Sequence, residues 1–477
     1  MAPQQHLDSL SALDAAFLLQ ESPTTHMHIG GVAIFRGKPP AFEDFLAHIR
    51  ARLDRTPRYR QKLAYPPVAI GRPRWIDDPR FNLEYHVRNA SLPAPGSDEQ
   101  LRKLVGRIYS ERLDRAKPLW ELLLVEGLAG GRFALISKTH HSVVDGVSGV
   151  DIATALFDLV PSPEPDPAPR AWVAQPEPSA AELAAAAVSG NAREIATLPA
   201  KALATLADRT RLRGLGEAAL TVLRPAPSSP LNVEIGSHRR VAFVPTKLDD
   251  FKVVKNAYGG TVNDVVLAVT AGALRAWMHG RGLKTEGVEL RAAVPVSVRS
   301  DDEKGAGGNR LTQLVAPLPV DVSDPVARLR LVQESMTGLK ESKQALGAEI
   351  IAGAQEFAPP TILAQSTRLN FSTRAYNLLV TNVPGPQIPL YLLGRELDQM
   401  YPVAFLAGDR ALAVAVMSYN GRAGFGLIGD YDKLDDIDVV ADGIAASLAE
   451  YVTLARKRTR SRTRARSRAR DADPTPA

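Results

Sequence analysis

The chain contains no cysteine among its 477 residues. This absence excludes structural disulfides, zinc sites with thiolate ligands and a cysteine nucleophile. The amino-terminal sequence MAPQQHLDSL lacks the basic start and the apolar core of a signal peptide. No apolar run approaches the roughly 20 residues that a helix needs to cross a bilayer. We therefore expect a cytoplasmic protein without a membrane-spanning helix.

The net charge of +6 is concentrated at the carboxyl end of the chain. Residues 456–470 include nine basic side chains, and with Asp471 and Asp473 this segment carries +7, which leaves −1 for the rest. A run of like charges is ordinarily a solvated, disordered extension, and we expect residues 456–477 to form one. Such a segment is also suited to hold a protein near anionic lipid. It predicts no specific nucleic acid partner.

The length exceeds that of one typical hydrophobic core, which favours two domains or one large domain with two halves. Residues 161–178 contain seven prolines and cannot form a regular helix or a central strand. An alanine-rich stretch at 180–223 follows, with a predominantly helical composition. We therefore predict an N-terminal half at 1–160, a linker and helical crossover at 161–229, a C-terminal half at 230–455 and a tail at 456–477.

Both halves alternate strand and helix signals. The segment HIGGVAIF at 28–35 reads as a strand, and two apolar runs on either side of AGG at 129–131 predict an antiparallel hairpin. Asn420 and Gly421 separate two further apolar runs and suit a tight hairpin turn. Ser97 with Gln100 is typical of a capping box at the start of a helix. The pattern predicts mixed α and β structure in two comparable halves.

The segment LISKTHHSVVDGVSG at 135–149 is the strongest candidate for a functional site. The predicted strand delivers His140 and His141 to its carboxyl end, and Gly146 lets the chain bend into a helix. An unperturbed imidazole titrates near pH ~6.5, so one of these rings can take a proton from a hydroxyl at neutral pH. Asp145 is placed either to orient a ring or to anchor the turn.

Three other interpretations of the histidines compete with a general base. A metal site is disfavoured, because HHxxxD is not the HExxH pattern and the chain offers no thiolates. A second interpretation is that both are core histidines whose ring nitrogens are hydrogen-bonded within the protein. A serine triad lacks support, since Ser148 does not lie in a GxSxG elbow. A base without a protein nucleophile implies direct transfer between two bound substrates, and we predict no metal and no cofactor.

HHSVVDG matches the HHxxxDG signature of the coenzyme A-dependent acyltransferase superfamily, which includes chloramphenicol acetyltransferase and the condensation domains of peptide synthetases. Further segments, in order from residue 9 to about 435, also match, and together with HHSVVDG they make the chain resemble the bacterial wax ester synthase/diacylglycerol acyltransferase family. These segments are LSALDAAFLLQESPTTHMHIGGVAIF at the start, PLWE at 118–121, PLNVEIGSHRRVAF at 230–243, NDVVLAV at 263–269, PVSVR at 295–299, TNVPGP at 381–386 and SYNGRAGFGLIGDY at 418–431.

The resemblance implies an α/β fold with mixed sheets. Two chloramphenicol acetyltransferase-like halves would enclose a channel that holds the active site, with acyl-CoA entering from one face and an alcohol from the other. It implies that His141 is the base that deprotonates the acceptor hydroxyl and that His140 supports it. It also implies that Asp145 is structural and pairs with an arginine, for which Arg299 is a candidate.

The resemblance assigns two further motifs to the site. Asn263 and Asp264 match a motif that shapes it, and Asn263 is placed to donate a hydrogen bond to the developing oxyanion; the alternative is that both are first-turn helix caps beside Thr261. Pro118, Leu119 and Trp120 are expected to form a site wall by packing.

The expected activity is O-acyl transfer from long-chain acyl-CoA to a lipid alcohol. Diacylglycerol would give triacylglycerol, and a fatty alcohol would give a wax ester. The expected place of action is peripheral, at a membrane or lipid-droplet surface. The alternatives are a stand-alone condensation-type enzyme that uses carrier-protein thioesters, and a catalytically inactive lipid-droplet scaffold. The sequence predicts no particular oligomeric state.

Overall fold

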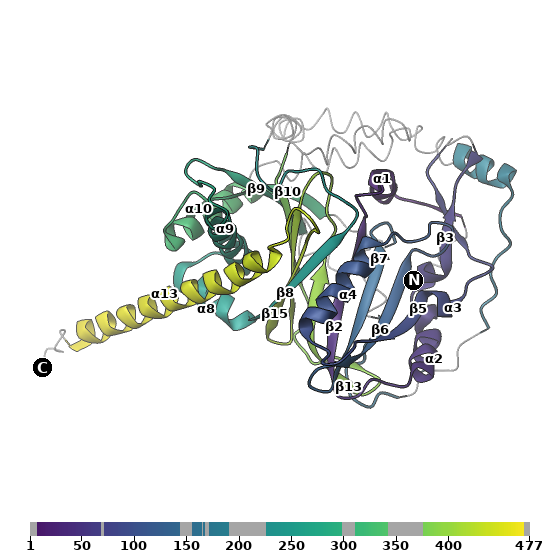
Figure 1. Cartoon of the computed structure of the whole chain (residues 1–477), viewed down its shortest axis with the longest axis horizontal. Helices are drawn as coiled ribbons and strands as arrows, with labels where there is room; N and C mark the ends of the chain where they lie inside the picture. Colours follow the sequence, from purple (N-terminus) through teal and green to yellow (C-terminus); the bar gives the residue numbers. More distant parts are fainter. Residues whose placement is uncertain are drawn as a thin grey trace, which may run out of the picture.

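The computed structural model of the chain describes residues 7–67, 71–143, 155–164, 166, 171–189, 226–297, 311–341 and 375–471. Within these ranges the protein is a mixed α/β molecule with two six-stranded sheets, one on each side, and a smaller three-stranded sheet (Figure 1). The predicted fold class of two halves with mixed sheets is confirmed.

The first large sheet has the strand order β12-β13-β2-β7-β6-β5. Its pairs are antiparallel except β5 with β6, which is parallel. The predicted hairpin around AGG is confirmed. The strands are β2 His28–Arg36, β5 Val87–Ser91, β6 Trp120–Leu128, β7 Arg132–His140, β12 Tyr391–Leu392 and β13 Arg395–Val403.

Helices and short strands from the first 110 residues of the chain surround this sheet. Helix α4 covers one face and begins with the predicted capping box, in which Ser97 and Gln100 each satisfy the other's backbone N–H. The three-stranded sheet has the order β1-β4-β3. The elements are β1 Asp8–Ser9, α1 Ala12–Gln20, α2 Phe42–Arg52, η1 Leu53–Arg55, η2 Pro57–Arg60, β3 Gln61–Ala64, β4 Arg74–Asp77, α3 Leu83–His86 and α4 Asp98–Ser110.

The second large sheet has the order β10-β9-β11-β14-β15-β8, in which β11 runs parallel to both of its neighbours. The hairpin of β14 and β15 turns at Asn420 and Gly421, which have positive φ angles of 41° and 78°. A primed turn needs this backbone conformation. The strands are β8 Arg239–Lys247, β9 Leu290–Ser297, β10 Leu311–Leu318, β11 Leu378–Pro384, β14 Leu412–Tyr419 and β15 Arg422–Asp430.

The strands β12 and β13 lie in the predicted C-terminal half of the sequence but belong to the N-terminal sheet. β13 pairs with β2, with Met400 opposite Ala33 and Val403 opposite Gly30. The C-terminal half therefore contributes these two strands, called here the exchanged segment, to the N-terminal sheet. The boundaries at 160 and 230 did not anticipate this feature. Those boundaries remain a prediction.

Glycines on β15 let β13 approach the second sheet closely. A Cβ atom at Gly424 would lie 2.1 Å from the carbonyl oxygen of Met400, and one at Gly426 would lie 1.8 Å from that of Pro402. Neither position can carry a side chain without moving the backbone. The alternating glycines of GRAGFGLIGD thus allow the two sheets to meet where the exchanged segment crosses.

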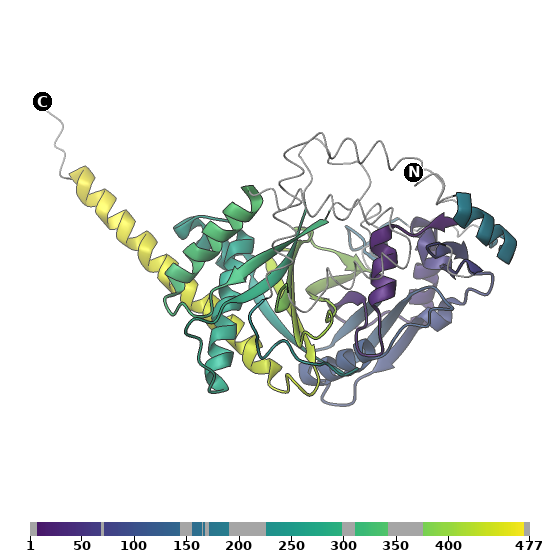
Figure 2. The same cartoon turned by 90° about the horizontal axis from the view of Figure 1, so that it is seen from above.

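Helices α8 Leu248–Tyr258, α9 Val262–Gly280, α10 Pro325–Glu341 and α13 Ile437–Asp471 gather beside the second sheet (Figure 2). Helix α13 packs through its first part, where Ile444, Leu448 and Tyr451 are buried, and then projects from the body. The prediction of a disordered tail is wrong for residues 456–471, because they continue this helix. Arginine is a good helix former, and the packed first part supplies the nucleus that an isolated helix lacks.

The described part of the proline-rich linker has no regular helix or strand. It is held to the N-terminal half at Asp166, which accepts a 2.6 Å hydrogen bond from Arg52 Nε. The helix at 180–189 follows, and Ser179 and Glu182 cap its start. The rest of the alanine-rich crossover lies outside the described residues. Of the described helices, none combines the length and the apolar character that crossing a membrane requires.

Candidate active site

The two adjacent histidines lie where β7 leaves the sheet. The backbone N–H of His140 donates a 3.0 Å hydrogen bond to Leu119 O on the β6 side, and that of His141 donates a 2.8 Å hydrogen bond to Met27 O on the β2 side. His28 lies opposite His140 in the register of β2 and β7. The pair is therefore held from both neighbouring strands.

The ring of His141 packs against two phenyl rings that also contact each other, with their centroids 6.1 Å apart. It stacks on Phe17 with the ring centroids 3.9 Å apart and the planes at 25°, and it meets Phe405 edge-on at 5.7 Å and 87°. Burial lowers the pKa of His141 to about 4, and an interaction with its own backbone carbonyl opposes this shift. The residue nevertheless stays partly exposed. At neutral pH it therefore presents an uncharged imidazole that can accept a proton.

His140 is fully enclosed, with 1% of its surface exposed. Its Nδ1 atom accepts a 3.1 Å hydrogen bond from the backbone N–H of Ser142 and lies 2.7 Å from the hydroxyl of the same residue. Burial lowers the pKa of His140 to about 3, and the charge of Arg115 and that of His141 when it is protonated lower it further. A ring that is this hard to protonate, and that lacks exposure, is suited to a supporting role.

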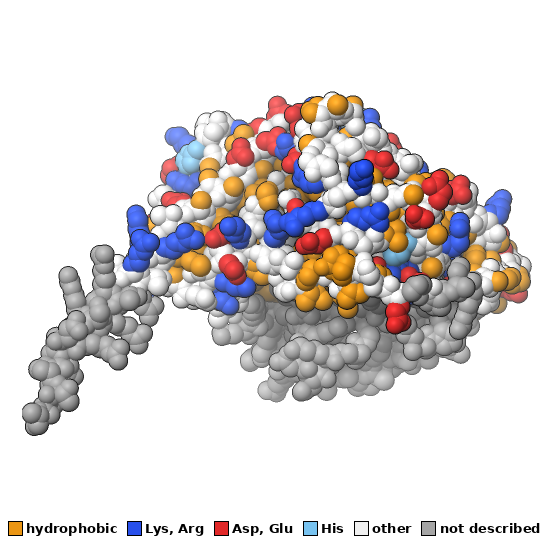
Figure 3. Space-filling view, turned by 90° about the horizontal axis from the view of Figure 1, so that it is seen from below, with side chains coloured by type: hydrophobic (Ala, Val, Ile, Leu, Met, Phe, Trp, Pro, Cys, Tyr) orange, Lys and Arg blue, Asp and Glu red, His pale blue; other side chains and the backbone are white. Residues whose placement is uncertain are grey.

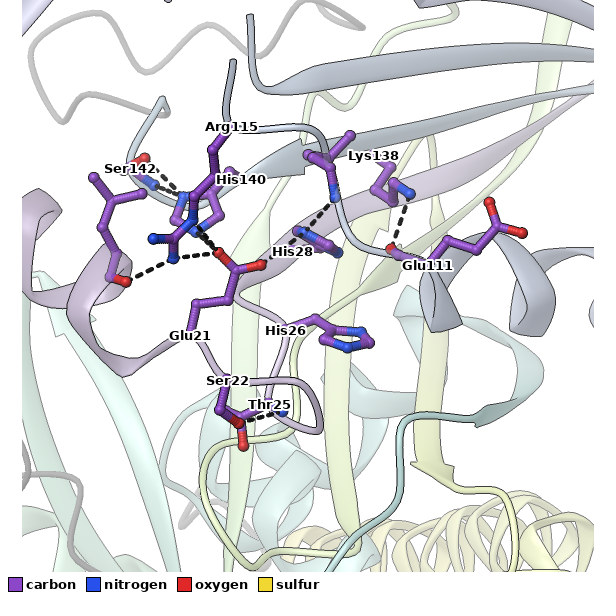
Figure 4. Close-up of polar contacts among 12 residues, drawn as sticks. Glu21, Ser22, Thr25, His26, His28, Glu111, Arg115, Lys138, His140 and Ser142 are labelled. Carbon is purple, nitrogen blue, oxygen red and sulfur yellow. Dashed lines mark hydrogen bonds and ion pairs between the residues drawn. The ribbon is translucent and has the colours of Figure 1, made fainter. Parts of the chain in front are cut away.

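A buried carboxylate faces this histidine from the end of helix α1 (Figure 4). Glu21 Oε2 lies 3.7 Å from His140 Nε2, and Glu21 Oε1 lies 3.9 Å from His28 Nε2. Arg115 Nε donates a 2.8 Å hydrogen bond to Glu21 Oε2. Sequence reasoning did not single out Glu21, Arg115 or His28. The signal was present for Glu21 and His28, which lie within the quoted amino-terminal segment.

The two phenyl rings were also missed. Phe17 belongs to the same amino-terminal segment, in helix α1. Phe405 follows strand β13 of the exchanged segment, and nothing in its local pattern connects it with residues 264 positions earlier in the chain. Only the crossing of β13 brings it to His141.

Two predicted site residues lie outside the described part of the chain. Asp145 and Gly146 belong to residues 144–154, and the proposed partner Arg299 belongs to 298–310. Their predicted roles stay predictions.

Pro118, Leu119 and Trp120 are all buried. Trp120 Nε1–H donates a 2.7 Å hydrogen bond to Tyr59 O, and the indole stacks on His86 with the centroids 4.7 Å apart. Leu119 meets His140 through its backbone oxygen. These side chains pack the core behind the histidines, and their predicted place in a site wall stays a prediction.

Asp264 caps helix α9. Its Oδ2 atom accepts a 2.7 Å hydrogen bond from the N–H of Thr261, and Thr261 Oγ1 accepts one from the N–H of Asp264. Asn263 instead reaches β11, where its Oδ1 accepts a 3.4 Å hydrogen bond from Asn382 Nδ2. The contact joins the NDVVLAV and TNVPGP segments. The structure thus supports the capping interpretation for Asp264, whereas the oxyanion role of Asn263 stays a prediction.

A cavity of about 220 Å³ lies on the same side of β7 as His140, between this strand, β5, β6 and α4. Four charged side chains line it: Arg88, Glu111, Glu121 and Lys138. Lys138 is 1% exposed and hydrogen-bonds Ile108 O and Glu111 O. Asn89 and three apolar side chains, those of Ile108, Leu123 and Ile136, complete the lining. Among the described residues, no group of three or more His, Asp or Glu side chains is arranged to hold a metal ion.

Comparison with known proteins shows what this chain is similar to. The catalytic domain of the wax ester synthase/diacylglycerol acyltransferase family matches residues 10–266, and the C-terminal domain of that family matches residues 307–451. A probable diacylglycerol O-acyltransferase of Mycobacterium tuberculosis, tgs1, is 33% identical over 456 residues, which are 95% of this chain and 97% of that protein.

Two solved structures place the fold. The wax ester synthase/diacylglycerol acyltransferase from Marinobacter aquaeolei VT8 is similar with a TM-score of 0.66 and 31% identity, over 94% of this chain and all of that one. The trichothecene 15-O-acetyltransferase from Fusarium sporotrichioides shares the fold with a TM-score of 0.57 and 12% identity, over 93% and 94% of the two chains. The chain therefore belongs to the wax ester synthase/diacylglycerol acyltransferase family.

Proposed function

We propose that this protein transfers a long-chain acyl group from acyl-CoA to the hydroxyl of a lipid alcohol, with diacylglycerol as the first acceptor and fatty alcohol as a second. The observation that carries the proposal is the state of His141. The residue is partly exposed, and its ring is neutral at physiological pH and packs against Phe17 and Phe405. The names of the relatives support the same acceptor class.

The proposed reaction needs one proton carrier. His141 takes the hydroxyl proton of the acceptor while its oxygen attacks the thioester carbonyl carbon. The C–O bond forms, the C–S bond then breaks, and the proton passes from the imidazolium to the departing thiolate to give free CoA. No covalent acyl-enzyme intermediate forms in this series of steps. His140 holds the end of β7 in place and takes no proton itself.

The apolar surroundings of His141 support a lipid acceptor. Two phenyl rings pack against the base, so the acceptor hydroxyl would react in a site that excludes much of the water. Placing the apolar chains of a diacylglycerol or a fatty alcohol in such surroundings costs little free energy. A small polar alcohol would lose its hydration there without gaining apolar contacts.

We further propose that the protein works at a membrane or lipid-droplet surface. Over one face of the body, Lys and Arg side chains lie among Asp and Glu, and hydrophobic side chains are scattered, with the largest group at the lower centre of the view (Figure 3). A surface of mixed charge attracts anionic lipid weakly. The concentrated basic charge of the chain lies instead on the projecting part of α13, from Arg456 onward.

The function is tested with purified protein, palmitoyl-CoA and a panel of acceptors, with free CoA followed over time. Dipalmitoylglycerol, hexadecanol, glycerol and water alone form the panel. We expect CoA release to depend on the two lipid alcohols and to coincide with formation of the ester. Absence of release with every alcohol would overturn the proposal, and release that requires a carrier-protein thioester would indicate a condensation-type enzyme.

A further inference from the structure

The carboxylate of Glu21 is held in an unusual place for a charged group. Its side chain is 2% exposed, at the residue that ends helix α1. Arg115 reaches it from the loop before β6, donates to Oε2 through Nε and Nη2, and also donates a 2.7 Å hydrogen bond to Leu18 O. The guanidinium therefore fixes both the carboxylate and the end of the helix that carries it.

The hydrogen bonds around His140 favour one tautomer. A neutral ring whose Nδ1 accepts the backbone N–H of Ser142 carries its proton on Nε2, and the Ser142 hydroxyl, 2.7 Å from Nδ1, then donates to the same nitrogen. This nitrogen is buried, has no hydrogen-bond partner among the described residues and faces Glu21 Oε2 at 3.7 Å. The only charge of suitable sign beside this N–H, in the part of the chain that the structure describes, is thus a clamped carboxylate (Figure 4).

We propose that Glu21, clamped by Arg115, is a positioning residue that holds His140 in its Nε2–H tautomer and thereby fixes the end of β7 that presents His141. The inference rests on the proposed function, in which His141 is the base. Glu21 does not touch the substrate. It acts through His140, whose peptide bond to His141 transmits any rotation of the strand end to the base.

The other charged groups near His140 do not substitute for Glu21. Lys138 lies two residues earlier on the same strand and is already paired with Glu121 at 3.3 Å. His28 approaches Glu21 from β2, but its Nε2 accepts the backbone N–H of Leu113 at 3.4 Å. Burial lowers the pKa of His28 well below its usual value, so it stays uncharged beside the carboxylate.

The decisive substitution is Glu21→Gln, which keeps the size and removes the charge. The glutamine carbonyl would stay with Arg115, so the amide N–H would turn toward His140 Nε2. Two donors would then face each other, and the ring would shift toward the Nδ1–H tautomer or rotate. Histidine-labelled protein reports this directly, because the ¹⁵N shifts of the two ring nitrogens differ between tautomers; a His140→Gln variant assigns the signals.

Kinetics provide the second measurement. For Glu21→Gln we expect kcat to fall by about tenfold or more, since a misplaced base slows the chemical step, and KM for palmitoyl-CoA to change by less than about twofold. Arg115→Met is the second variant, and because it leaves the buried Glu21 carboxylate without its ion-pair partner, we expect a lower melting temperature as well. It should lower kcat by about threefold or more.

Asp158→Asn is the matched control. Asp158 is 8% exposed and pairs with Arg52 in the same half of the molecule, so its loss also weakens a buried ion pair. We expect a lower melting temperature with kcat within about twofold of the wild type. An unchanged His140 tautomer in Glu21→Gln overturns the proposal whatever the activity. So does a fall in kcat no larger than that of Asp158→Asn.

The tautomer measurement also separates this inference from the proposed function. It requires no substrate. If the wild type released no CoA with any lipid alcohol, the proposed function would fail, while a tautomer shift in Glu21→Gln would still support the contact between Glu21 and His140.

Discussion

His141 and Phe17 form a stacked pair whose ring centroids lie 3.9 Å apart. The pair joins helix α1 to the end of β7, so a base from one element receives its apolar cover from another. This relationship keeps the imidazole uncharged, because the phenyl ring replaces water that would solvate the protonated form.

Replacing His141 by alanine should abolish acyl transfer, with a fall in kcat of about 100-fold or more, because a positioned base ordinarily contributes 10²–10⁴-fold. Because the ring stacks on Phe17, its loss should also lower the melting temperature, but a folded variant without turnover is the expected result. CoA release and thermal unfolding, measured on the same preparation, check both expectations. Turnover like that of the wild type would contradict the assignment of the base.

Replacing His140 by alanine should reduce activity less than the His141 change and reduce stability more. The ring is fully enclosed and accepts the N–H of Ser142, so its loss leaves a buried donor unpaired, at a cost of about 1–3 kcal/mol. Of the two variants, His140→Ala should have the lower free energy of unfolding in urea, and His141→Ala should have the lower kcat. Equal kinetic losses from both would leave no preference for His141 as the base.

Replacing Phe17 by alanine should raise the pKa of His141 from about 4 toward the ordinary ~6.5. A base works in its neutral form, so kcat/KM should fall on the acid side of this pKa, and that fall should begin at higher pH in the variant. Phe17→Leu keeps apolar cover and should leave the profile near that of the wild type. Coincident profiles for all three proteins would show that the stack does not control the pKa.

Acid should destabilise the protein through His140. Its folded pKa of about 3 lies below its unfolded value of ~6.5, so between these limits the unfolded chain binds one more proton. The stability contribution is present above pH ~6.5 and is lost as the pH falls toward 3, at about 1.4 kcal/mol per pH unit. Urea unfolding at pH 7 and pH 5.5 should show a smaller pH difference in His140→Gln than in the wild type.

Deleting residues 456–477 should reduce sedimentation with anionic liposomes at low salt. Each basic residue near such a surface contributes about 1 kcal/mol, and salt screens this attraction, so the difference between truncated and full-length protein should shrink as ionic strength rises. Activity on detergent-dispersed substrate should be spared. Equal binding of the two proteins would assign the lipid contact to another part of the molecule.

Local patterns in the sequence predicted much of the fold. The capping boxes at Ser97 and Thr261 and the turn at Asn420 and Gly421 follow from hydrogen bonds and backbone angles within a few residues. The placement of His140 and His141 at a strand end also follows from local periodicity. Each of these features depends on neighbours in the chain, which is the information that spacing carries.

The basic segment at the carboxyl end shows where local charge misleads. Its composition is typical of disorder, yet residues 456–471 continue α13 because the preceding turns are packed against α8 and α9. A helix that is already nucleated adds residues at low cost, and arginine opposes this little.

The surroundings of the two histidines were decided by tertiary structure. Phe405 reaches His141 because β13 joins the sheet of the other half, and Glu21 reaches His140 because helix α1 ends against β7. No periodicity connects residues so far apart in the chain. The sequence by itself determined which residue types carry the chemistry, whereas packing between distant elements determined their burial, their tautomer and their charge, because these depend on which atoms replace water around each ring.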